Sequence, residues 1–408
     1  MGLIVQKYGG SSVADVEKIR TVARRVIDTK AAGNDIVAIV SAMGKTTDNL
    51  IALAKQVVDN PPDREMDMLL ATGEQQSIAL LAMAIQSMGH GAVSFTGPQV
   101  GILTDGSFSR SRIKAVKEDR IRAELDKGNA VIVAGFQGAS IDGQITTLGR
   151  GGSDTTAVAV AAALGAEMCD IFTDVDGVYT ADPRVVPDAR RLKAIAYEEM
   201  VELASLGAKV LHSRAVVLAW KYQTPLRVRS TFKQDEGTLV VNDTQALDME
   251  RFVVSGVAVD KNQAKISLIG VPDKPGVAAT IFGILGKAGI VIDMIIQNVS
   301  RDGRSDISFT VPRTDLHKTM AASAEICQET GTEEALSDEN IAKVSIVGIG
   351  MQSHSGVASQ MFEALANQNI NIQMISTTEI KVSCVIELDR ADDAARALHH
   401  QYGLSGNS

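Results

Sequence analysis

The run TTLGRGGSDTT, from Thr146 to Thr156, is the stretch around which the rest of the chain is organised. Its glycines surround one arginine, and hydroxyl and acidic residues follow at the start of a helix-like stretch: Gly149, Arg150, Gly151, Gly152, Ser153, Asp154, Thr155 and Thr156. Glycine lets the backbone turn at positive φ and approach a ligand closely. The free N–H groups of a helix start favour an anion. The run therefore predicts an anion cradle, capped by Ser153; an ordinary glycine-rich turn is the alternative.

A second turn of the same construction lies at the N-terminus. The strand-like run from Ile4 to Lys7 leads into Tyr8, Gly9, Gly10 and Ser11. A helix with its apolar face on Val16, Ile19, Val22, Val26 and Ile27 then extends to Gly33. Such a turn can hold phosphate oxygens, with Lys7 as a point charge, although a solvated lysine at a strand end is the ordinary reading.

Two further polar features follow strand-like or helical runs. SAMGKTT, from Ser41 to Thr47, is not a P-loop, because Ile39 stands where that motif requires glycine. Ser41 and Thr47 instead fit hydroxyl donors at the carboxyl end of a strand, where open α/β sheets bind ligands. Glu74 lies among apolar residues in a long helical region, 64–88, and the pattern alone favours a solvated face for it.

Strand-like and helix-like runs alternate over the first 240 residues or so, which implies a mainly parallel sheet covered on both faces. The remaining strand-like runs are Ala92 to Phe95, Val100 to Leu103, Ala130 to Ala134 and Asp170 to Thr173, and helix-like runs cover 117–127 and 197–206. The loop TDVDGVYTADPR, Thr173 to Arg184, has acidic and aromatic residues but lacks the EF-hand glutamate. GAKVLHSR, beginning at Gly207, adds Lys209.

The C-terminal part contains an internal repeat at a spacing of 80 residues. GVA at Gly276 recurs at Gly356, and upstream KISLIG from Lys265 reappears 78 residues later as KVSIVG from Lys343. Each copy reads strand, helix, strand, strand, helix, and the second copy has no residues for a final strand. We therefore expect Phe252 to Val259 to pair with the sheet of the second copy and to join the two copies into one unit.

Composition restricts the classes of function. The 408 residues have a net charge of −9 without blocks of basic residues, which argues against nucleic acid or membrane as a main partner. No leader segment or membrane-length apolar run is recognised, so we expect a cytoplasmic protein. Cys169, Cys327 and Cys384 read as reduced thiols without metal-ligand spacing, and the adjacent His399 and His400 read as a solvated helix end.

These motifs together resemble aspartate kinases of the amino-acid kinase superfamily with paired C-terminal ACT domains. The resemblance is carried by KYGGSSV, SAMGKTT, TGE, TTLGRGGSDTT, TDVDGVYTADPR, GAKVLHSR and the duplicated pattern, and it covers essentially the whole chain. It implies a three-layer αβα kinase domain with a mainly parallel sheet, and two ferredoxin-like βαββαβ ACT domains. The expected divisions are 1–245 for the kinase domain, 246–264 for a linker and extra strand, 265–340 for ACT domain 1, and 341–408 for ACT domain 2.

The activity implied by the resemblance is transfer of the γ-phosphoryl group of MgATP to the side-chain carboxylate of L-aspartate. A carboxylate is already nucleophilic at neutral pH, so positioning and charge neutralisation do the work. The implied catalytic residues are Lys7, Asp154 and Lys209. The implied ATP-binding residues are Lys7, Tyr8, Gly9, Gly10, Ser11, Thr173, Asp174, Tyr179, Asp182, Arg184 and Lys209. The implied aspartate-binding residues are Ser41, Thr47, Glu74, Arg150, Gly151, Gly152 and Ser153, with no metal held by protein ligands alone.

ACT domains of this family bind amino-acid effectors at the seam between copies, and lysine and threonine are the expected inhibitors. The implied effector residues in the first copy are Asp273, Lys274, Gly276, Val277, Ala278, Ala279, Ile292, Asp293, Met294, Gln297 and Asn298. Their second-copy counterparts are Ser355, Gly356, Val357, Ala358, Asn371 and Ile372. The alternative is a repeat that only dimerises the protein. The expected assembly is a homo-oligomer, or an α2β2 complex with a shorter regulatory chain started at Met249.

Two rival functions remain at this level. Another kinase of the same superfamily, acting on glutamate, acetylglutamate or a nucleoside monophosphate, would share the glycine turns but not the ACT repeat. An amino-acid sensor without kinase activity is disfavoured because Lys7, Glu74, Arg150, Asp154 and Lys209 are all present.

Overall fold

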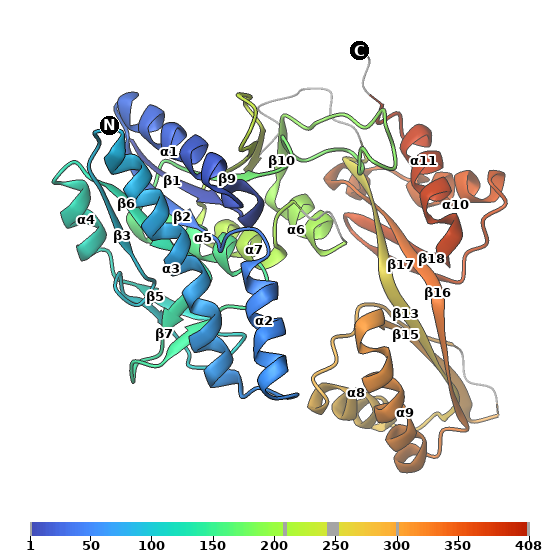
Figure 1. Ribbon diagram of the computed structural model, residues 1–408. Coiled ribbons are helices and arrows are strands. Elements are labelled where there is room, and N and C mark those ends of the chain that lie inside the picture. The colour runs from blue at the N-terminus through green and yellow to red at the C-terminus, as the bar shows by residue number, and fades with distance from the viewer. Residues whose placement is uncertain (1, 207–209, 243–252, 299–301, 406–408) are drawn as a thin grey trace. The chain divides into compact units, whose positions relative to one another are not determined.

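The computed structural model describes residues 2–206, 210–242, 253–298 and 302–405, and these divide into two compact units (Figure 1). The first unit holds residues 2–178, 191–205 and 210–242. The second holds residues 179–190, Leu206, 253–298 and 302–405. The chain therefore leaves the first unit after Val178 and returns to it at Arg191.

The first unit is built on an eight-stranded sheet in the order β10-β12-β11-β9-β1-β2-β6-β3. Its strands are β1 (Leu3–Tyr8), β2 (Asp35–Val40), β3 (Ala92–Phe95), β6 (Ala130–Ala134), β9 (Met168–Thr173), β10 (Ala194–Ala196), β11 (Leu226–Ser230) and β12 (Thr238–Val241). Every neighbouring pair is parallel except β11 with β12. The mainly parallel sheet expected from the sequence is therefore confirmed.

A smaller sheet in the same unit has the order β5-β4-β7-β8. Its strands are β4 (Ile102–Thr104), β5 (Ile113–Val116), β7 (Gln137–Ala139) and β8 (Ile145–Thr147). The strand predicted at Val100 to Leu103 begins two residues later and belongs here rather than to the main sheet. The strand β8 leads directly into the turn that contains Arg150.

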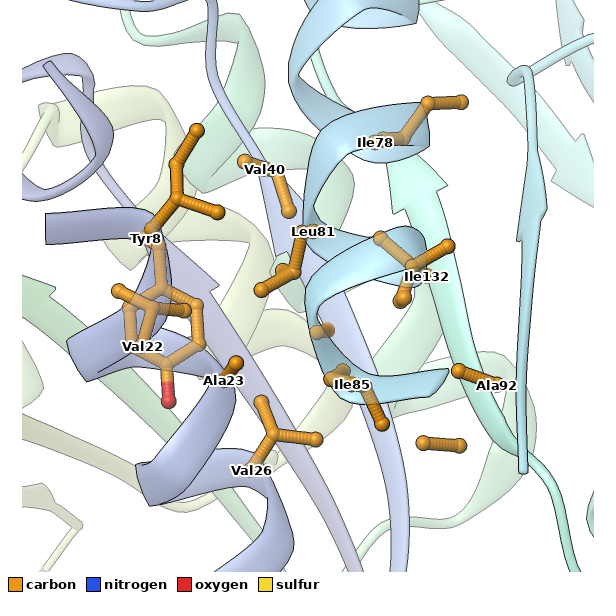
Figure 2. Close-up of a cluster of buried hydrophobic side chains, with 14 of the residues drawn as sticks. Tyr8, Val22, Ala23, Val26, Val40, Ile78, Leu81, Ile85, Ala92 and Ile132 are labelled. Carbon is orange, nitrogen blue, oxygen red and sulfur yellow. The ribbon is translucent and has the colours of Figure 1, made fainter. Parts of the chain in front are cut away.

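Helices cover both faces of the main sheet (Figure 1). They are α1 (Val16–Ala31), α2 (Thr46–Val57), α3 (Asp63–Ser87), α4 (Asp119–Leu125), α5 (Gly152–Leu164), α6 (Tyr197–Ser205) and α7 (Ser213–Tyr222), and a 3-10 turn, η1, spans Gly10–Val13. On one face, α1 and α3 pack Val22, Val26, Leu81 and Ile85 against the strands (Figure 2). Val16 is an exception to the predicted apolar face, since it is 57% exposed at the first residue of α1.

The opposite face is covered by α5, whose residues are buried almost all round. A helix that is apolar on all sides belongs in a protein interior, and α5 contacts β1, β9 and α7. Among the described residues one helix, α3, is long and apolar enough to cross a membrane by length and composition. Because its buried residues belong to the cluster shared with α1 and the sheet, we interpret α3 as a core helix.

The second unit is built on one six-stranded antiparallel sheet in the order β14-β15-β13-β16-β18-β17. Its strands are β13 (Gly256–Pro272), β14 (Ile295–Gln297), β15 (Arg304–Pro312), β16 (Glu334–Val347), β17 (Met374–Thr378) and β18 (Lys381–Glu387). Its helices are α8 (Val277–Lys287), α9 (Leu316–Thr330), α10 (Val357–Asn367) and α11 (Ala391–Gln401), with 3-10 turns at Arg313–Asp315, Ile349–Ser353 and Leu388–Arg390.

The extra strand expected ahead of the first copy pairs with the second copy, as predicted. Gly256 to Val259 lie opposite Val347 to Val344 of β16, while Phe252 lies outside the described residues. The prediction treated this segment and the first strand of copy one as two strands. In the structure β13 runs without interruption from residue 256 through KISLIG, so they are a single strand. Its pairing with β16 is continuous except for register shifts around Gln263.

Residues 179–190 pack on the second unit through polar and apolar contacts. The Val257 amide donates to the Thr180 carbonyl at 2.7 Å, and the Thr180 hydroxyl lies 2.9 Å from Nε2 of His399. Ala181 and Val186 join the core cluster of α10, α11 and the sheet. His399 is only 1% exposed, so the solvated helix end predicted for it is wrong, and burial lowers its pKa.

Candidate active site

The segments that follow three parallel strands meet at one edge of the main sheet. The Ser41 amide donates to the Tyr8 carbonyl, the Gly44 amide to the Gly10 carbonyl, and the Gly135 amide to the Val40 carbonyl, each at 3.0 Å. These residues follow or end β1, β2 and β6, so the loops are joined at the carboxyl ends of the strands. Ligands of open α/β sheets bind at this edge.

Close approach of these loops depends on glycine. A Cβ on Gly10 would lie 2.8 Å from the Ala42 carbonyl oxygen, and one on Gly9 would lie 3.3 Å from Nζ of Lys7. The Lys7 ammonium is therefore placed over the first turn, as the resemblance implied for a cation that neutralises phosphate. Any side chain at Gly10 would push the first turn away from the Ser41–Gly44 loop.

An ion pair joins the first glycine turn to the central one. Nζ of Lys7 lies 2.7 Å from Oδ1 of Asp154, and each side chain is 12% exposed. Asp154 is in the first turn of α5, and Gly151 is the N-cap in the left-handed region at φ 70°. The predicted capping by Ser153 is wrong, because the helix begins one residue earlier, at Gly152, and no side chain caps it. The uncapped amides of this N-terminus favour an anion.

His212 is a neighbour of this turn that the sequence prediction missed. A Cβ on Gly151 would overlap the His212 ring, so Gly151 is required both by its positive φ and by this contact. Burial lowers the pKa of His212, and the nearby Asp154 carboxylate partly opposes this. Its Nδ1 has no hydrogen-bond partner within the described ranges. His212 belongs to the GAKVLHSR motif, and this was the sequence feature that could have indicated it as a site residue.

Glu74 lies on α3 with its side chain in the interior, only 3% exposed. Oε1 accepts a hydrogen bond from the Ala42 amide at 3.1 Å, and Oε2 has no partner among the residues that the structure describes. Burial raises the pKa of Glu74 to about 7. The solvated face favoured by the pattern is therefore wrong. The contact with Ala42 places this carboxyl group beside the Ser41–Gly44 loop.

The other proposed aspartate contacts lie near this edge. Ser41 follows β2, and Thr47 is in the first turn of α2. Arg150 is exposed, and its guanidinium has no acceptor in the described part of the chain. Gly152 packs so closely that a Cβ would lie 3.0 Å from that of Leu148, and Ser153 lies against Gly135.

Two buried or half-buried charges hold the segment that leads into Arg150, and sequence reasoning missed both. Asp67, fully buried on α3, accepts hydrogen bonds from the Ser109 amide and from the amide and hydroxyl of Thr147. Arg214 donates to the Leu148 carbonyl at 2.8 Å and the Ser111 carbonyl at 2.7 Å. An acid inside an apolar helical stretch was the only signal for Asp67.

The predicted nucleotide residues do not all belong to the described part of the first unit. The Tyr8 ring is fully buried against Phe172 and its hydroxyl donates to Gln6, so its side chain is not available to a ligand. Thr173 ends β9 and Asp174 follows it in the first unit, and the Thr173 hydroxyl donates to the Asp174 carboxylate at 3.0 Å. The others lie in the second unit or outside the described residues: Tyr179, Asp182, Arg184 and Lys209. Arg184 and Asp182 form a two-point ion pair.

The predicted effector residues include the segments that begin α8 and α10. Gly276 and Gly356 are the N-caps of these helices, both in the left-handed region, at φ 95° and 88°. The Asp293 carboxylate is paired with the buried ammonium of Lys343. Some side chains in the predicted set cannot contact an effector directly, because Met294 and Val357 are buried in core clusters.

Comparisons with known proteins agree with this architecture. A model of the amino acid kinase family matches residues 2–230, and two ACT domain models match 266–327 and 344–402. The aspartokinase of Pseudomonas aeruginosa is 54% identical over 404 residues, which are 99% of this chain and 98% of that protein. The structure of E. coli aspartokinase III with aspartate and ADP matches 98% of this chain and 99% of that one, at 26% identity and a TM-score of 0.83. The T-state structure of that enzyme with lysine and aspartate gives 0.77 over the same shares, also at 26% identity.

Proposed function

The chain belongs to the aspartokinase family and is an ATP-dependent kinase, and from this premise we propose that it phosphorylates the side-chain carboxylate of L-aspartate to give 4-phospho-L-aspartate. The observation that carries the choice of an amino-acid substrate is Glu74. A buried carboxyl group with one unpartnered oxygen is costly unless a ligand compensates it, and the ammonium group of an amino acid does so.

Phosphoryl transfer to a carboxylate requires positioning and charge neutralisation. Lys7 stands over the Gly9–Gly10 turn and supplies a cation, while the first amides of α5 and of the Gly9 turn supply donors. We assign Asp154 the task of orienting Lys7, with which it is paired at 2.7 Å, rather than that of a general base. The nucleophile is already ionised, so a base would add nothing.

Recognition of the α-ammonium and α-carboxylate groups of aspartate is assigned to residues at the same edge of the main sheet. Arg150, exposed and without a partner in the described chain, would hold the α-carboxylate by two parallel hydrogen bonds. Glu74 would receive the α-ammonium group, and Ser41 and Thr47 would add hydroxyl contacts. This arrangement leaves the side-chain carboxylate of aspartate as the reacting group.

The nucleotide is assigned to Thr173, Asp174, Tyr179, Asp182, Arg184 and Lys209, following the family resemblance. MgATP is the expected form. The described residues contain no group of three or more His, Cys, Asp or Glu that could hold a metal. Mg²⁺ keeps several waters and binds chiefly through substrate phosphates. Asp154 is the carboxylate that would face its water shell. When bound, the ion neutralises charge on the phosphates.

Regulation is assigned to the ACT repeat, with lysine, threonine or both as inhibitors. A T-state structure of E. coli aspartokinase III contains lysine, and the matched N-caps Gly276 and Gly356 support two pseudo-equivalent effector sites here. The effectors would act by binding one conformation more tightly than another. The enzyme would then catalyse the first step towards lysine, threonine and methionine, in the cytoplasm and as an oligomer.

The direct test is ATP-dependent formation of an acyl phosphate, trapped as the hydroxamate with hydroxylamine. Aspartate should give hydroxamate and glutamate should not, and lysine with threonine should suppress the signal. Hydroxamate from glutamate alone would assign the chain to another substrate. Lysine or threonine binding without any ATP consumption would make it a sensor.

A further inference from the structure

A second polar cavity lies on the face of the main sheet opposite the ion pair of Lys7. Successive side chains of a strand point to opposite faces, so Lys7 faces α5 whereas Gln6 and Tyr8 face α1. Figure 2 shows Tyr8 beside Val22 and Ala23 of α1. The cavity, of about 470 Å³, is lined on this side by α1, Gln6, Phe172 of β9, Arg229 of β11 and the segment from Thr231 to Gln234. It is therefore separate from the proposed aspartate and phosphate contacts.

Three guanidinium groups line this cavity: those of Arg24, Arg25 and Arg229. Two of them stack on one ring, since Cζ of Arg25 lies 4.7 Å and Cζ of Arg229 lies 5.6 Å from the centroid of Phe172. Like charges held this close repel each other, and burial and Arg25 both lower the pKa of Arg229. The fold therefore keeps two cations together at an energetic cost.

The carboxylates around the cavity do not compensate all of this charge. Asp170 is buried beneath it and binds Arg227 at 2.6 Å, while Arg229 is 3.8 Å away. Asp28 lines the cavity but is exposed. Charged residues outside the lining are paired with one another: Lys18, which lies over the Phe232 ring, with Asp15, Asp235 with Arg191, and Lys233 with Asp176. The sum of charges facing the cavity is thus positive.

Two of the three arginines, Arg25 and Arg229, are nevertheless fixed in place by neutral acceptors. Arg25 donates to the carbonyls of Thr231 and Lys233 at 3.0 and 3.1 Å, and Arg229 donates twice to the Asp235 carbonyl. Carbonyl acceptors hold a guanidinium without neutralising it. Arg24, one turn from Asp28, has neither an ion pair nor an acceptor in the described part of the chain.

We propose that this cavity between α1, β9 and β11 is a binding site for a small multivalent anion, of the kind offered by phosphate esters and polycarboxylates. Preorganised guanidinium groups are the side chains best suited to such groups, and the volume lies within the range of small-molecule sites. Phe232, half exposed at the rim, offers an apolar surface to the rest of the ligand.

The test is equilibrium dialysis of labelled pyrophosphate against the full-length protein. Lys7→Ala serves as the background, because it weakens phosphate binding at the catalytic edge. In the Lys7→Ala protein one pyrophosphate site per chain should remain. Adding Arg24→Ala should lower the affinity of this site for pyrophosphate tenfold or more. Arg20→Ala is the matched control: it removes the same charge from the same helix, outside the cavity lining, and should change the affinity less than twofold.

Competition with citrate distinguishes the two classes of anion. Stronger binding of pyrophosphate would identify a phosphate ester as the ligand, and stronger displacement by citrate would identify a polycarboxylate. Absence of a remaining site in the Lys7→Ala protein would overturn the proposal. Equal weakening by Arg20→Ala and Arg24→Ala would also overturn it, because diffuse charge attraction would then explain the binding.

Discussion

At the scale of single residues, Glu74 shows how burial turns a carboxyl group into a functional candidate. Its pKa in the folded protein is about 7, against 4.5 for an unperturbed glutamate. Between pH 4.5 and pH 7 the Glu74 carboxyl group is protonated in the folded protein and ionised in the unfolded chain. Its contribution to the free energy of unfolding is therefore complete below pH 4.5 and is lost as the pH rises through 7. The loss amounts to about 3 kcal/mol.

Glu74→Gln should remove this pH dependence. Relative to the wild type, the variant should gain up to about 3 kcal/mol in free energy of unfolding between pH 4.5 and pH 8, measured by urea denaturation of both proteins at each pH. Hydroxamate formation from aspartate should be lost. A constant difference in stability across this range would show that Glu74 is ionised throughout.

The same group predicts a pH effect on substrate binding in the wild type. The ionised form is needed to bind an ammonium group, so the affinity for aspartate should fall roughly tenfold for each pH unit well below 7. The dissociation constant, measured calorimetrically from pH 5 to 8, checks this. An affinity that does not change below pH 7 would assign the ammonium group to another acceptor.

Arg150 tests the other end of the substrate. Arg150→Ala should raise KM for aspartate by about ten- to a hundredfold, because a charge-assisted, two-point hydrogen bond is lost, while KM for ATP should change little. Arg64→Ala, an exposed arginine on α3 outside the site residues, is the control. An unchanged KM for aspartate in Arg150→Ala would contradict the clamp.

At the scale of elements, the start of α5 depends on the fit between Gly151 and His212. Gly151→Ala adds a methyl group that overlaps the His212 ring and forces a non-glycine residue to φ 70°. Strain of about 1–3 kcal/mol is expected, with a lower kcat/KM as the arginine turn shifts. Gly151→Ala with His212→Ala should recover part of the stability, since only the backbone strain then remains. If the double variant has the same melting temperature as Gly151→Ala, the contact with His212 does not contribute to the loss of stability.

Helices and strands were predicted well where the hydrophobic periodicity of a run and a glycine at its end indicate the same boundary. The runs that became β1, α1 and α3 were identified within one or two residues, because alternation and helical spacing depend on local burial. Residues whose role depends on a distant partner were not found. Asp67 and Arg214 act through segments far away in the sequence, and the buried state of Glu74 depends on packing against a loop that precedes it by about 30 residues.

At the scale of the whole molecule, residues 179–190 connect the fold of the kinase sheet to the ACT repeat. Thr180→Val should leave His399 Nε2 without its partner and cost about 1–3 kcal/mol in the stability of this contact. Hydrogen exchange at Val257, whose amide donates to Thr180, should become faster. Thr280→Val, which removes a hydroxyl on exposed α8, is the matched control. Equal exchange in both variants would show that the hydroxyl does not fasten the loop.

The family and the fold class were predictable because the motifs and the 80-residue repeat are sequence patterns. The assignment of Tyr179, Asp182 and Arg184 to the second unit was not, because the resemblance describes one kinase loop and says nothing of where it packs. The merged strand β13 was also missed: the polar residues Asp260 to Asn262 at its junction are typical of a turn, and only pairing with β16 shows that the strand continues through them.

The length of β13 and β16 affects how such a protein can be recombined. Each strand crosses both repeats, so a chain cut between the copies would leave half of a long strand without its neighbour. An unpaired strand edge of this kind favours association with other chains. A chimera that exchanges one repeat between relatives should therefore express poorly, whereas exchange of residues 253–405 as a block keeps both strands paired. The two repeats therefore form one structural unit, and neither is expected to fold without the other.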